Sequence, residues 1–249
     1  GGWVRLVSRH GTQEGGGVTR RRWRGSKEGR TAGDTSFDRG AEILKRDNTL
    51  PFMETFKDGK KLVVAGSAWE KDEELMEALI AARASDPGVK YLIAPHDIHP
   101  ERIRRLCAAL PGAVLYTQRE GADLASARVL VLDTVGILTK VYSYADLTLI
   151  GGGFTRSGIH NVLEPAVFGR PVLCGPNYAD YIEAVGLKGC GGLTVVGDSE
   201  EFIEAVGRFL DDPQAFAHSA MASRDFVRNN AGATQKIVEA LVEELNDKK

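Results

Sequence analysis

Cysteine is scarce in this 249-residue sequence, and the three cysteines lie far apart, at Cys107, Cys174 and Cys190. No C-x-x-C pair occurs, so the sequence offers neither a disulfide framework nor a cysteine-based metal site. Few and widely spaced cysteines are typical of proteins in a reducing compartment. We therefore expect a cytoplasmic protein.

Long hydrophobic runs are also absent. The longest apolar stretches fall far short of the roughly 20 residues that a helix needs to span a bilayer. The amino terminus lacks the apolar core of a signal peptide. These absences predict a soluble chain without an export signal.

The sequence has no strong excess of charge, with 32 Lys and Arg against 34 Asp and Glu. The small net charge of -2 hides an asymmetry, because residues 1–33 hold eight basic and two acidic side chains. The remaining residues therefore carry 24 basic and 32 acidic side chains, a net charge of -8. A mildly acidic body argues against nucleic acid as the main partner.

Residues 1–33 contain nine glycines and almost no periodic apolar pattern. We expect a disordered tail, or a start region that is not native to the fold. The alternative is a basic arm for RNA or anionic lipid, because Trp23 interrupts the arginine run of residues 20–24.

Helical periodicity begins at Asp34. A first segment places Phe37, Ala41 and Leu44 on one helical face, and residues 48–57 give a second short amphipathic segment. We expect residues 34–60 to form a helical linker.

Short apolar runs then alternate with helical patterns. They predict a sheet of about six parallel strands, with seven candidate runs at residues 62–65, 89–94, 113–117, 129–132, 145–150, 171–174 and 192–196. Helices are expected at residues 70–84, 100–110, 133–144, 161–168, 198–210, 213–227 and 234–245. The predicted fold class is α/β: a single doubly wound Rossmann-like domain over residues 61–249, with a helical lead-in and a helical carboxyl-terminal segment.

The most informative stretch is a strand, a glycine-rich loop and a helix. The apolar run Leu147–Ile150 stops at Gly151, Gly152 and Gly153, and a helical segment starts at Asn161. Open α/β sheets bind ligands at the carboxyl edge, where glycines let the backbone approach and a helix amino terminus attracts anions. The pattern predicts the donor-phosphate region of a nucleotide-sugar enzyme.

This loop does not match the G-x-G-x-x-G dinucleotide fingerprint, so NAD is disfavoured. Instead, Glu164 lies one turn beyond His160. A carboxylate there can accept both hydrogen bonds of a ribose diol, while the start of the helix faces a phosphate.

Two more loops are expected at the same edge. In residues 66–69, a glycine–serine turn can bind phosphate or carboxylate oxygens, or can serve for helix capping alone. In residues 95–102, His96, Asp97 and His99 suit a metal, an anionic ligand, or capping of the next helix. The anionic ligand is favoured over the metal, because no third His or Cys lies nearby.

Taken together, the motifs resemble those of 3-deoxy-D-manno-octulosonic acid (Kdo) transferases, which add Kdo to lipid A. The glycine-rich loop, the H-N-x-L-E-P-A segment from His160 and the G-P-N turn at residues 175–177 form the main match. Gly66-Ser67, the H-P-E-R segment from His99 and the D-T-V-G segment from Asp133 occur in the same order. Residues 33–39 resemble the segment that links the two halves of those enzymes. The resemblance covers about residues 31–245.

This resemblance implies a GT-B fold, in which two Rossmann-like domains flank the active site. The chain resembles only the carboxyl-terminal half, which holds CMP-Kdo. The family's general base, a glutamate in the amino-terminal domain, and its membrane anchor have no counterpart here. We therefore expect a fragment or a misplaced start, and we expect the isolated chain to be inactive.

The family acts at the cytoplasmic face of the bacterial inner membrane, with a lipid A precursor as acceptor. Membrane association is expected only through the amino-terminal part of the family. No cofactor and no metal are implied, because CMP-Kdo is the donor substrate.

By resemblance, eleven residues would form the CMP-Kdo pocket: Ser67, Pro95, His99, Arg102, Gly136, Gly151, Gly152, Gly153, His160, Asn161 and Glu164. Two departures concern the nucleotide contacts. Many members read P-R-H-P-E-R where residues 95–102 read P-H-D-I-H-P-E-R, and many have a glutamate at the position of Ile137.

The function implied by the resemblance is inverting transfer of Kdo from CMP-Kdo to a lipid A precursor. One alternative is a transferase that uses another nucleotide sugar, such as a UDP donor. The other is a non-catalytic nucleotide-binding module.

Overall fold

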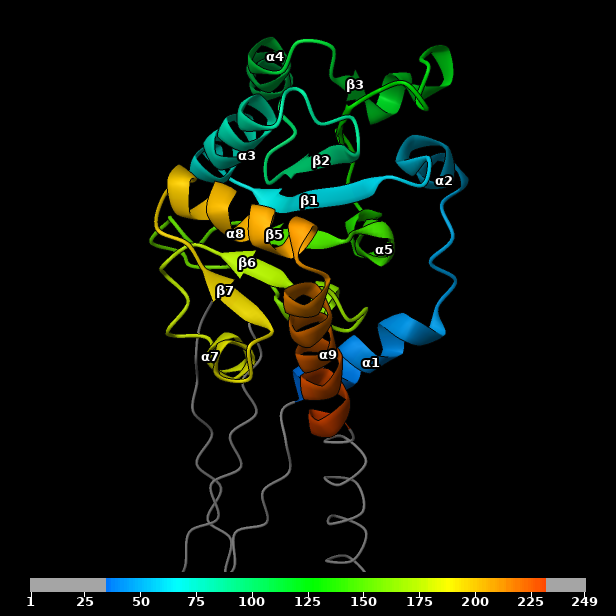
Figure 1. The fold of residues 1–249 in the computed structure, drawn as a ribbon. Helices are drawn as coiled ribbons and strands as arrows, with labels where there is room; N and C mark the ends of the chain where they lie inside the picture. Colours follow the sequence, from blue (N-terminus) through cyan, green and yellow to red (C-terminus); the bar gives the residue numbers. More distant parts are fainter. Residues whose placement is uncertain (1–34, 232–249) are drawn as a thin grey trace, which may run out of the picture.

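The computed structural model describes residues 35–231 (Figure 1). The expected tail of residues 1–33 and the expected helix at residues 234–245 lie outside this range. Within it, none of the helices has the length and apolar character that a membrane span requires.

The centre of the structure is a seven-stranded sheet whose paired strands all run parallel, in the order β3-β4-β2-β1-β5-β6-β7. Helices cover both faces, which confirms the predicted doubly wound α/β fold (Figure 1). All seven candidate runs form strands, one more than the expected count of about six. The strands are β1 (Lys61–Ala68), β2 (Val89–Pro95), β3 (Val114–Leu115), β4 (Val129–Val131), β5 (Leu147–Ile150), β6 (Val172–Cys174) and β7 (Leu193–Val195).

Nine α-helices lie in the described range. They are α1 (Thr35–Lys45), α2 (Pro51–Lys57), α3 (Glu70–Ala82), α4 (Pro100–Ala109), α5 (Leu138–Val141), α6 (Leu163–Ala166), α7 (Ile182–Gly189), α8 (Ser199–Asp211) and α9 (Pro213–Asn230). Two 3-10 turns complete the set, η1 (Tyr116–Gly121) and η2 (Tyr142–Tyr144).

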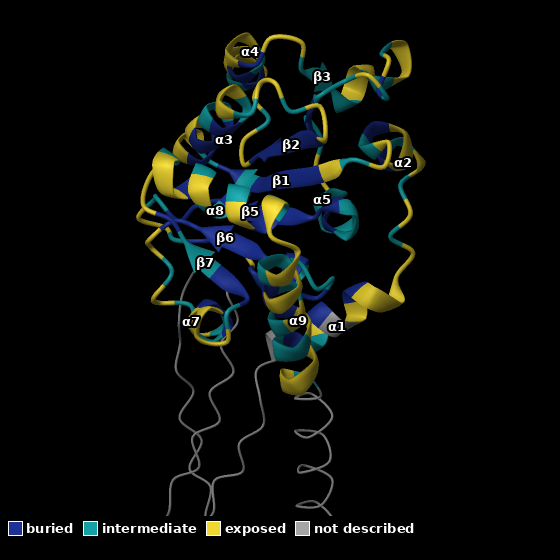
Figure 2. Ribbon diagram, viewed as in Figure 1, coloured by how far each residue is buried: buried dark blue, intermediate teal, exposed yellow. Residues whose placement is uncertain are grey.

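The central strands are buried (Figure 2), and their side chains face two apolar cores, one on each face of the sheet. In β1, Val63 and Ala65 face a core shared with α3, α4 and α8. Leu62 and Val64 face the opposite core, to which α1, α2, α5, α6, α7 and α9 contribute. Burial on both faces explains why β1 reads as a continuous apolar run rather than an alternating one.

The helical lead-in forms as α1 and α2, but α1 buries a different face from the one expected. Phe37 and Ile43 are buried in α1, and Phe37 makes an edge-to-face contact with Phe226 of α9 at 5.4 Å between ring centroids. Leu44 is 55% exposed, so its placement on the buried face was wrong. The helix turns the face of Phe37, Gly40 and Ile43 inward, because at Gly40 it lies close to α6 and α9.

The helix predicted from Asp133 to Tyr144 is the largest error in secondary structure. Asp133 does not cap a helix; its carboxylate accepts hydrogen bonds from the backbone N–H and the hydroxyl of Thr117, at 2.9 and 2.5 Å. The side chain therefore holds the start of η1, directly after β3. Only α5 and the turn η2 form in the remaining segment.

Two further differences lie near the glycine-rich loop. The helix expected over residues 161–168 is limited to the four residues of α6. Helix α7 was not predicted, because Gly186 and Gly189 weaken its helical pattern. A Cβ atom at Gly186 would lie 2.6 Å from the Phe226 ring, so this glycine lets α7 approach α9 closely.

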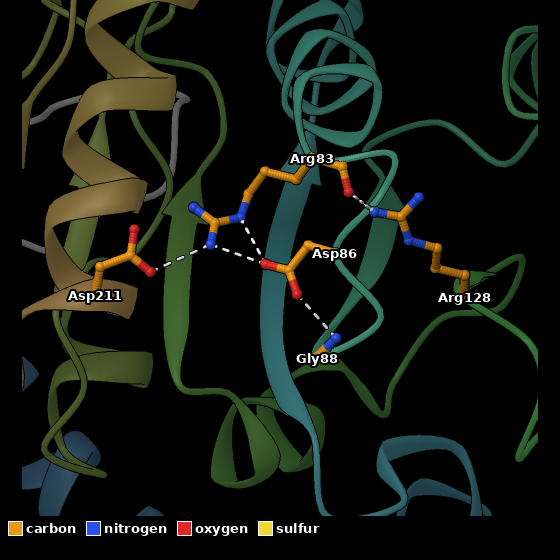
Figure 3. A network of polar contacts seen from close by, with 5 residues as sticks. All are labelled: Arg83, Asp86, Gly88, Arg128 and Asp211. Carbon is orange, nitrogen blue, oxygen red and sulfur yellow. Dashed lines mark hydrogen bonds and ion pairs between the residues drawn. The ribbon is translucent and has the colours of Figure 1, made fainter.

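At the amino edge of the sheet, a polar network joins three elements (Figure 3). The Arg83 guanidinium donates to Asp86 at 2.9 and 3.1 Å and to Asp211 at the end of α8 at 3.3 Å. Asp86 also accepts from the N–H of Gly88 at 2.9 Å, and Arg128 before β4 donates to the carbonyl of Arg83. Arg83 therefore ties the end of α3 to α8 and to β4.

We predict that Arg83→Gln lowers the free energy of unfolding by about 1–2 kcal/mol, because several hydrogen bonds to a largely buried side chain are lost. Urea unfolding followed by circular dichroism measures this change. The matched control is Arg228→Gln, which removes an exposed ion pair with Asp225 and should change stability by less than about 0.5 kcal/mol. Equal effects of the two substitutions would contradict a structural role for the network.

Candidate functional site

Three loops meet at the carboxyl edge of the sheet, as predicted. They follow β1, β2 and β5, which are neighbouring strands. Trp69 stacks on His96 with ring centroids 4.1 Å apart and planes 17° apart. The Trp69 Nε1–H donates to His160 Nε2 at 3.2 Å, and the rings of His96 and His160 lie 5.0 Å apart. One aromatic cluster thus contains a residue from each loop.

His160 is half-buried in this cluster. Burial lowers the pKa of its imidazole below the ordinary value, and the neighbouring His96 lowers it further. His160 is therefore a neutral ring under conditions in which an exposed histidine begins to gain a proton.

The three consecutive glycines are required by close backbone packing. A Cβ atom at Gly151 would lie 1.9 Å from the Ser67 carbonyl oxygen, and one at Gly153 would lie 2.4 Å from the Gly175 nitrogen. Gly152 has φ +92° and would place a Cβ 2.3 Å from the Gly158 carbonyl oxygen. The glycines thus let the loop fit against protein backbone on three sides.

Two N–H groups of this loop are engaged within the protein. The Gly151 N–H donates to the Gly66 carbonyl at 3.2 Å. The Gly152 N–H donates to the Asp72 carboxylate at 2.9 Å. A ligand phosphate would need donors other than these two.

Asp72 is a site residue that the sequence reasoning missed. Its carboxylate is fully buried, and one oxygen, Oδ2, accepts from both Trp69 N–H and Gly152 N–H at 2.9 Å. Burial raises the pKa of Asp72, and the two backbone hydrogen bonds oppose that rise. The spacing of Asp72, three residues after the helix cap at Trp69, is a signal that could have identified it.

Burial also governs the thiol of Cys174 at the end of β6. It raises the pKa of Cys174 to about 12, and the nearby Asp72 adds to the rise. A thiol with this pKa is not an activated nucleophile.

The loop after β2 contributes one residue to the aromatic cluster and another to the cap of α4. His96 joins the aromatic cluster, whereas the exposed His99 caps α4, where its Nδ1 accepts from the Glu101 N–H at 3.4 Å. Asp97 accepts from the His99 N–H at 2.9 Å. In the described part of the chain, no three His, Cys, Asp or Glu side chains come together as a metal-binding group.

Arg102 forms an ion pair within the protein. Its Nη2 atom lies 3.0 Å from Glu73 Oε1, which joins α4 to α3, and both side chains are largely buried. Burial raises the pKa of Glu73, and the positive charge of Arg102 opposes part of this rise. A ligand that used Arg102 would share it with this carboxylate.

Glu164 is half-buried on α6, and its Oε2 atom accepts from the Thr139 hydroxyl at 2.8 Å. Thr139 lies three residues after Gly136, an exposed residue with φ +94° in the loop after β4. Asn161 accepts from the Leu163 N–H at 2.9 Å, which fixes the turn before α6. Thr139 was not predicted from the sequence, because its partner is 25 residues away.

The other two predicted residues lie at strand ends. Ser67 is half-buried in the last part of β1, and Pro95 is buried as the last residue of β2, where it pairs with Ala68. Strand β1 runs on to Ala68 instead of stopping at Gly66-Ser67 as expected.

A polar hollow of about 330 Å³ lies beside the glycine-rich loop. It is lined by Arg156, Ser157, Gly158, Pro176, Asn177, Ala179, Asp180 and Tyr181. The Tyr181 hydroxyl donates to the Ser157 carbonyl at 2.7 Å, and the Asn177 amide donates to the Thr155 carbonyl at 2.9 Å. A larger hollow of about 660 Å³ is lined by residues 46–49, α2 and η2, away from the aromatic cluster.

Comparison with known proteins gives the following relations. No family model matches the chain. The 3-deoxy-D-manno-octulosonic acid transferase of Bordetella pertussis is 28% identical over 192 residues, which cover 74% of this chain and 44% of the relative. The chain therefore spans less than half the length of this curated relative. It resembles the carboxyl-terminal domain of Kdo transferases, as its motifs indicated.

Solved structures show the same fold. The carboxyl-terminal CMP-Kdo binding domain of WaaA from Acinetobacter baumannii has a TM-score of 0.62 and 21% identity, covering 78% of this chain and 98% of that domain. UDP-GlcNAc 2-epimerase from Neisseria meningitidis bound to UDP-GlcNAc has a TM-score of 0.57 and 15% identity, covering 85% and 54%. The predicted likeness to the carboxyl-terminal half of a GT-B enzyme is confirmed at the level of fold.

We predict that Gly151→Ala lowers the free energy of unfolding by about 3 kcal/mol or more, because its Cβ cannot fit beside the Ser67 carbonyl without moving backbone. Thermal unfolding measures the loss. Gly189→Ala is the matched control: nothing lies within 4 Å of its Cβ position, so stability should stay unchanged or rise by up to about 1 kcal/mol. A Gly151→Ala protein as stable as the wild type would refute the packing argument.

We also predict a pH dependence of stability from His160. Its folded-state pKa is lowered, so the unfolded chain takes up the proton more readily, and stability falls as the pH drops below the ordinary value of 6.5. His160→Asn should reduce this fall, whereas the exposed His99→Asn should retain it. Urea unfolding at a series of pH values compares the three proteins, and identical profiles for wild type and His160→Asn would contradict the assignment.

Proposed function

We propose that this chain is the donor-binding half of a Kdo transferase. In the complete enzyme, Kdo would pass from CMP-Kdo to a hydroxyl of a lipid A precursor. The single observation that carries the proposal is the meeting of the Ser67, His96 and His160 loops at one sheet edge, beside Glu164. The sequence resemblance to Kdo transferases and the fold of the WaaA CMP-Kdo binding domain support it.

The roles of the residues follow from their positions. Glu164 accepts the two hydroxyls of the ribose, and Thr139 holds its carboxylate through Oε2. Ser67 and His160 offer donors to the phosphate between ribose and sugar. Pro95, Gly151, Gly152 and Gly153 shape the edge, and the Asn161 turn presents Glu164.

Three of the predicted pocket residues have a supporting role in this proposal. His99 caps α4, and Arg102 pairs with Glu73 of α3. Gly136 gives the loop before α5 its left-handed conformation. Neither cofactor nor metal has an assigned role.

The reaction is a single displacement at the anomeric carbon of Kdo. A base removes the proton of the acceptor hydroxyl, the oxygen attacks the anomeric carbon, and the bond to the CMP phosphate breaks. One displacement inverts the configuration at that carbon. Groups at this edge stabilise the negative charge that develops on the leaving phosphate. We propose that the base comes from the other half of the enzyme.

Calorimetric titration with CMP, UMP and UDP tests this proposal. We expect binding of CMP, and we expect Glu164→Gln to weaken it about 10- to 100-fold, because the ribose loses hydrogen bonds to a charged group. Glu200→Gln on the exposed start of α8 is the control and should bind CMP as the wild type does. Tight UDP binding without any response to CMP would overturn the Kdo assignment in favour of a UDP-sugar donor.

A further inference from the structure

Trp69 contacts two histidines at once, and the two contacts use different parts of its ring system. The indole face stacks on His96, and the indole Nε1–H donates to His160 Nε2 at 3.2 Å. The Trp69 backbone N–H is held by Asp72. The indole is thus fixed by a stacking contact, a side-chain hydrogen bond and an anchored backbone.

The hydrogen bond determines which nitrogen of His160 carries a proton. An indole N–H can only donate, so His160 Nε2 must accept and cannot carry hydrogen itself. In a neutral imidazole the proton then lies on Nδ1. Rotating the imidazole by half a turn would place a carbon opposite the indole, so the same bond also selects the ring orientation.

The bond also requires that His160 be neutral. In a protonated ring both nitrogens carry hydrogen, and Nε2–H would face the indole N–H as a second donor. Burial of the ring and the proximity of His96 act in the same direction, because both lower the pKa of His160. His160 is anchored on its backbone side by its N–H, which donates to the Gly151 carbonyl at 3.0 Å.

The Nδ1–H group of His160 has no acceptor in the described part of the protein. None of its hydrogen bonds there involves Nδ1, and Nδ1 is not one of the fully buried unpartnered side-chain atoms. A directed donor is therefore open to a ligand at an edge where two loop N–H groups, of Gly151 and Gly152, are already engaged.

We propose that Trp69 is a positioning residue that fixes His160 as the neutral Nδ1–H tautomer, so that His160 donates a hydrogen bond to an anionic oxygen of the bound ligand. The identity of this oxygen rests on the proposed function, in which it belongs to the phosphate of a CMP-sugar. His96 contributes by stacking on the indole, which keeps the indole plane in place.

Nitrogen-15 NMR of the full chain with labelled histidine tests the tautomer without any ligand. His160→Asn identifies the His160 signals, and the shifts of the two ring nitrogens show which one is protonated at neutral pH. We expect Nδ1–H in the wild type. Protonation on Nε2 in the wild type would overturn the proposal. Because Trp69 stays intact in this measurement, the result does not depend on whether a Trp69 variant folds.

Trp69→Phe is the decisive variant, because it keeps an aromatic ring for His96 and removes only the indole donor. We expect the His160 signals to move toward the Nε2–H tautomer and the Kd for CMP to rise about 3- to 10-fold, the size of one hydrogen bond. His96→Phe keeps the indole donor and should leave the tautomer unchanged. An unchanged tautomer in Trp69→Phe would overturn the proposal, as would wild-type CMP affinity after a change of tautomer.

The two proposals fail separately. A wild-type chain with His160 in the Nδ1–H form that binds no CMP overturns the proposed function and supports the role of Trp69 in setting the tautomer. A chain that binds CMP through Glu164 with His160 in the Nε2–H form supports the proposed function and overturns the role of Trp69.

Discussion

One buried carboxylate oxygen joins the two loops on which the candidate site depends. Asp72 Oδ2 accepts from the N–H of Trp69, which starts α3, and from the N–H of Gly152, in the loop after β5. A buried carboxylate is costly unless it accepts hydrogen bonds, and both of the donors to Oδ2 are backbone N–H groups, from segments 83 residues apart in sequence. The oxygen thus fixes the distance between the loops, and the contact between Trp69 and His160 follows from it.

The two edges of the sheet are stabilised in different ways. At the amino edge, Arg83 gathers ion pairs from exposed or partly exposed partners (Figure 3). At the carboxyl edge, the close approach is made by backbone against backbone at Gly151, Gly152 and Gly153. Charged groups near the site are instead paired inward, as Arg102 is with Glu73.

The fold could be predicted from the sequence because its signals are local. Apolar runs with turn residues after them gave the strands, and apolar residues at helical spacing gave α3, α4, α8 and α9. The signals failed where distant partners decide the structure. Asp133 reads as a helix cap but bonds to Thr117, and Gly186 reads as a helix breaker but lies inside α7 against Phe226.

The candidate site, like the fold, could be predicted in part from the sequence. The meeting of the three loops was predicted because parallel strands end at the same edge of a sheet, and His160 and Glu164 were proposed as site residues from their spacing. Their partners were not predicted, because Thr139 contacts Glu164 and the Trp69 indole contacts His160 across the fold. Asp72, which joins the Trp69 and Gly152 backbones, was missed for the same reason. The nature of the ligand is a proposal that rests on resemblance and on the chemistry of these side chains.

The packing of the three consecutive glycines limits what a glycine-rich loop indicates about the substrate of a protein family. Each of them excludes a side chain because protein backbone occupies the space, whatever ligand is bound. Descendants of this fold could therefore change their substrate and still retain all three glycines. A shared glycine-rich loop is therefore evidence of common architecture rather than of a common substrate.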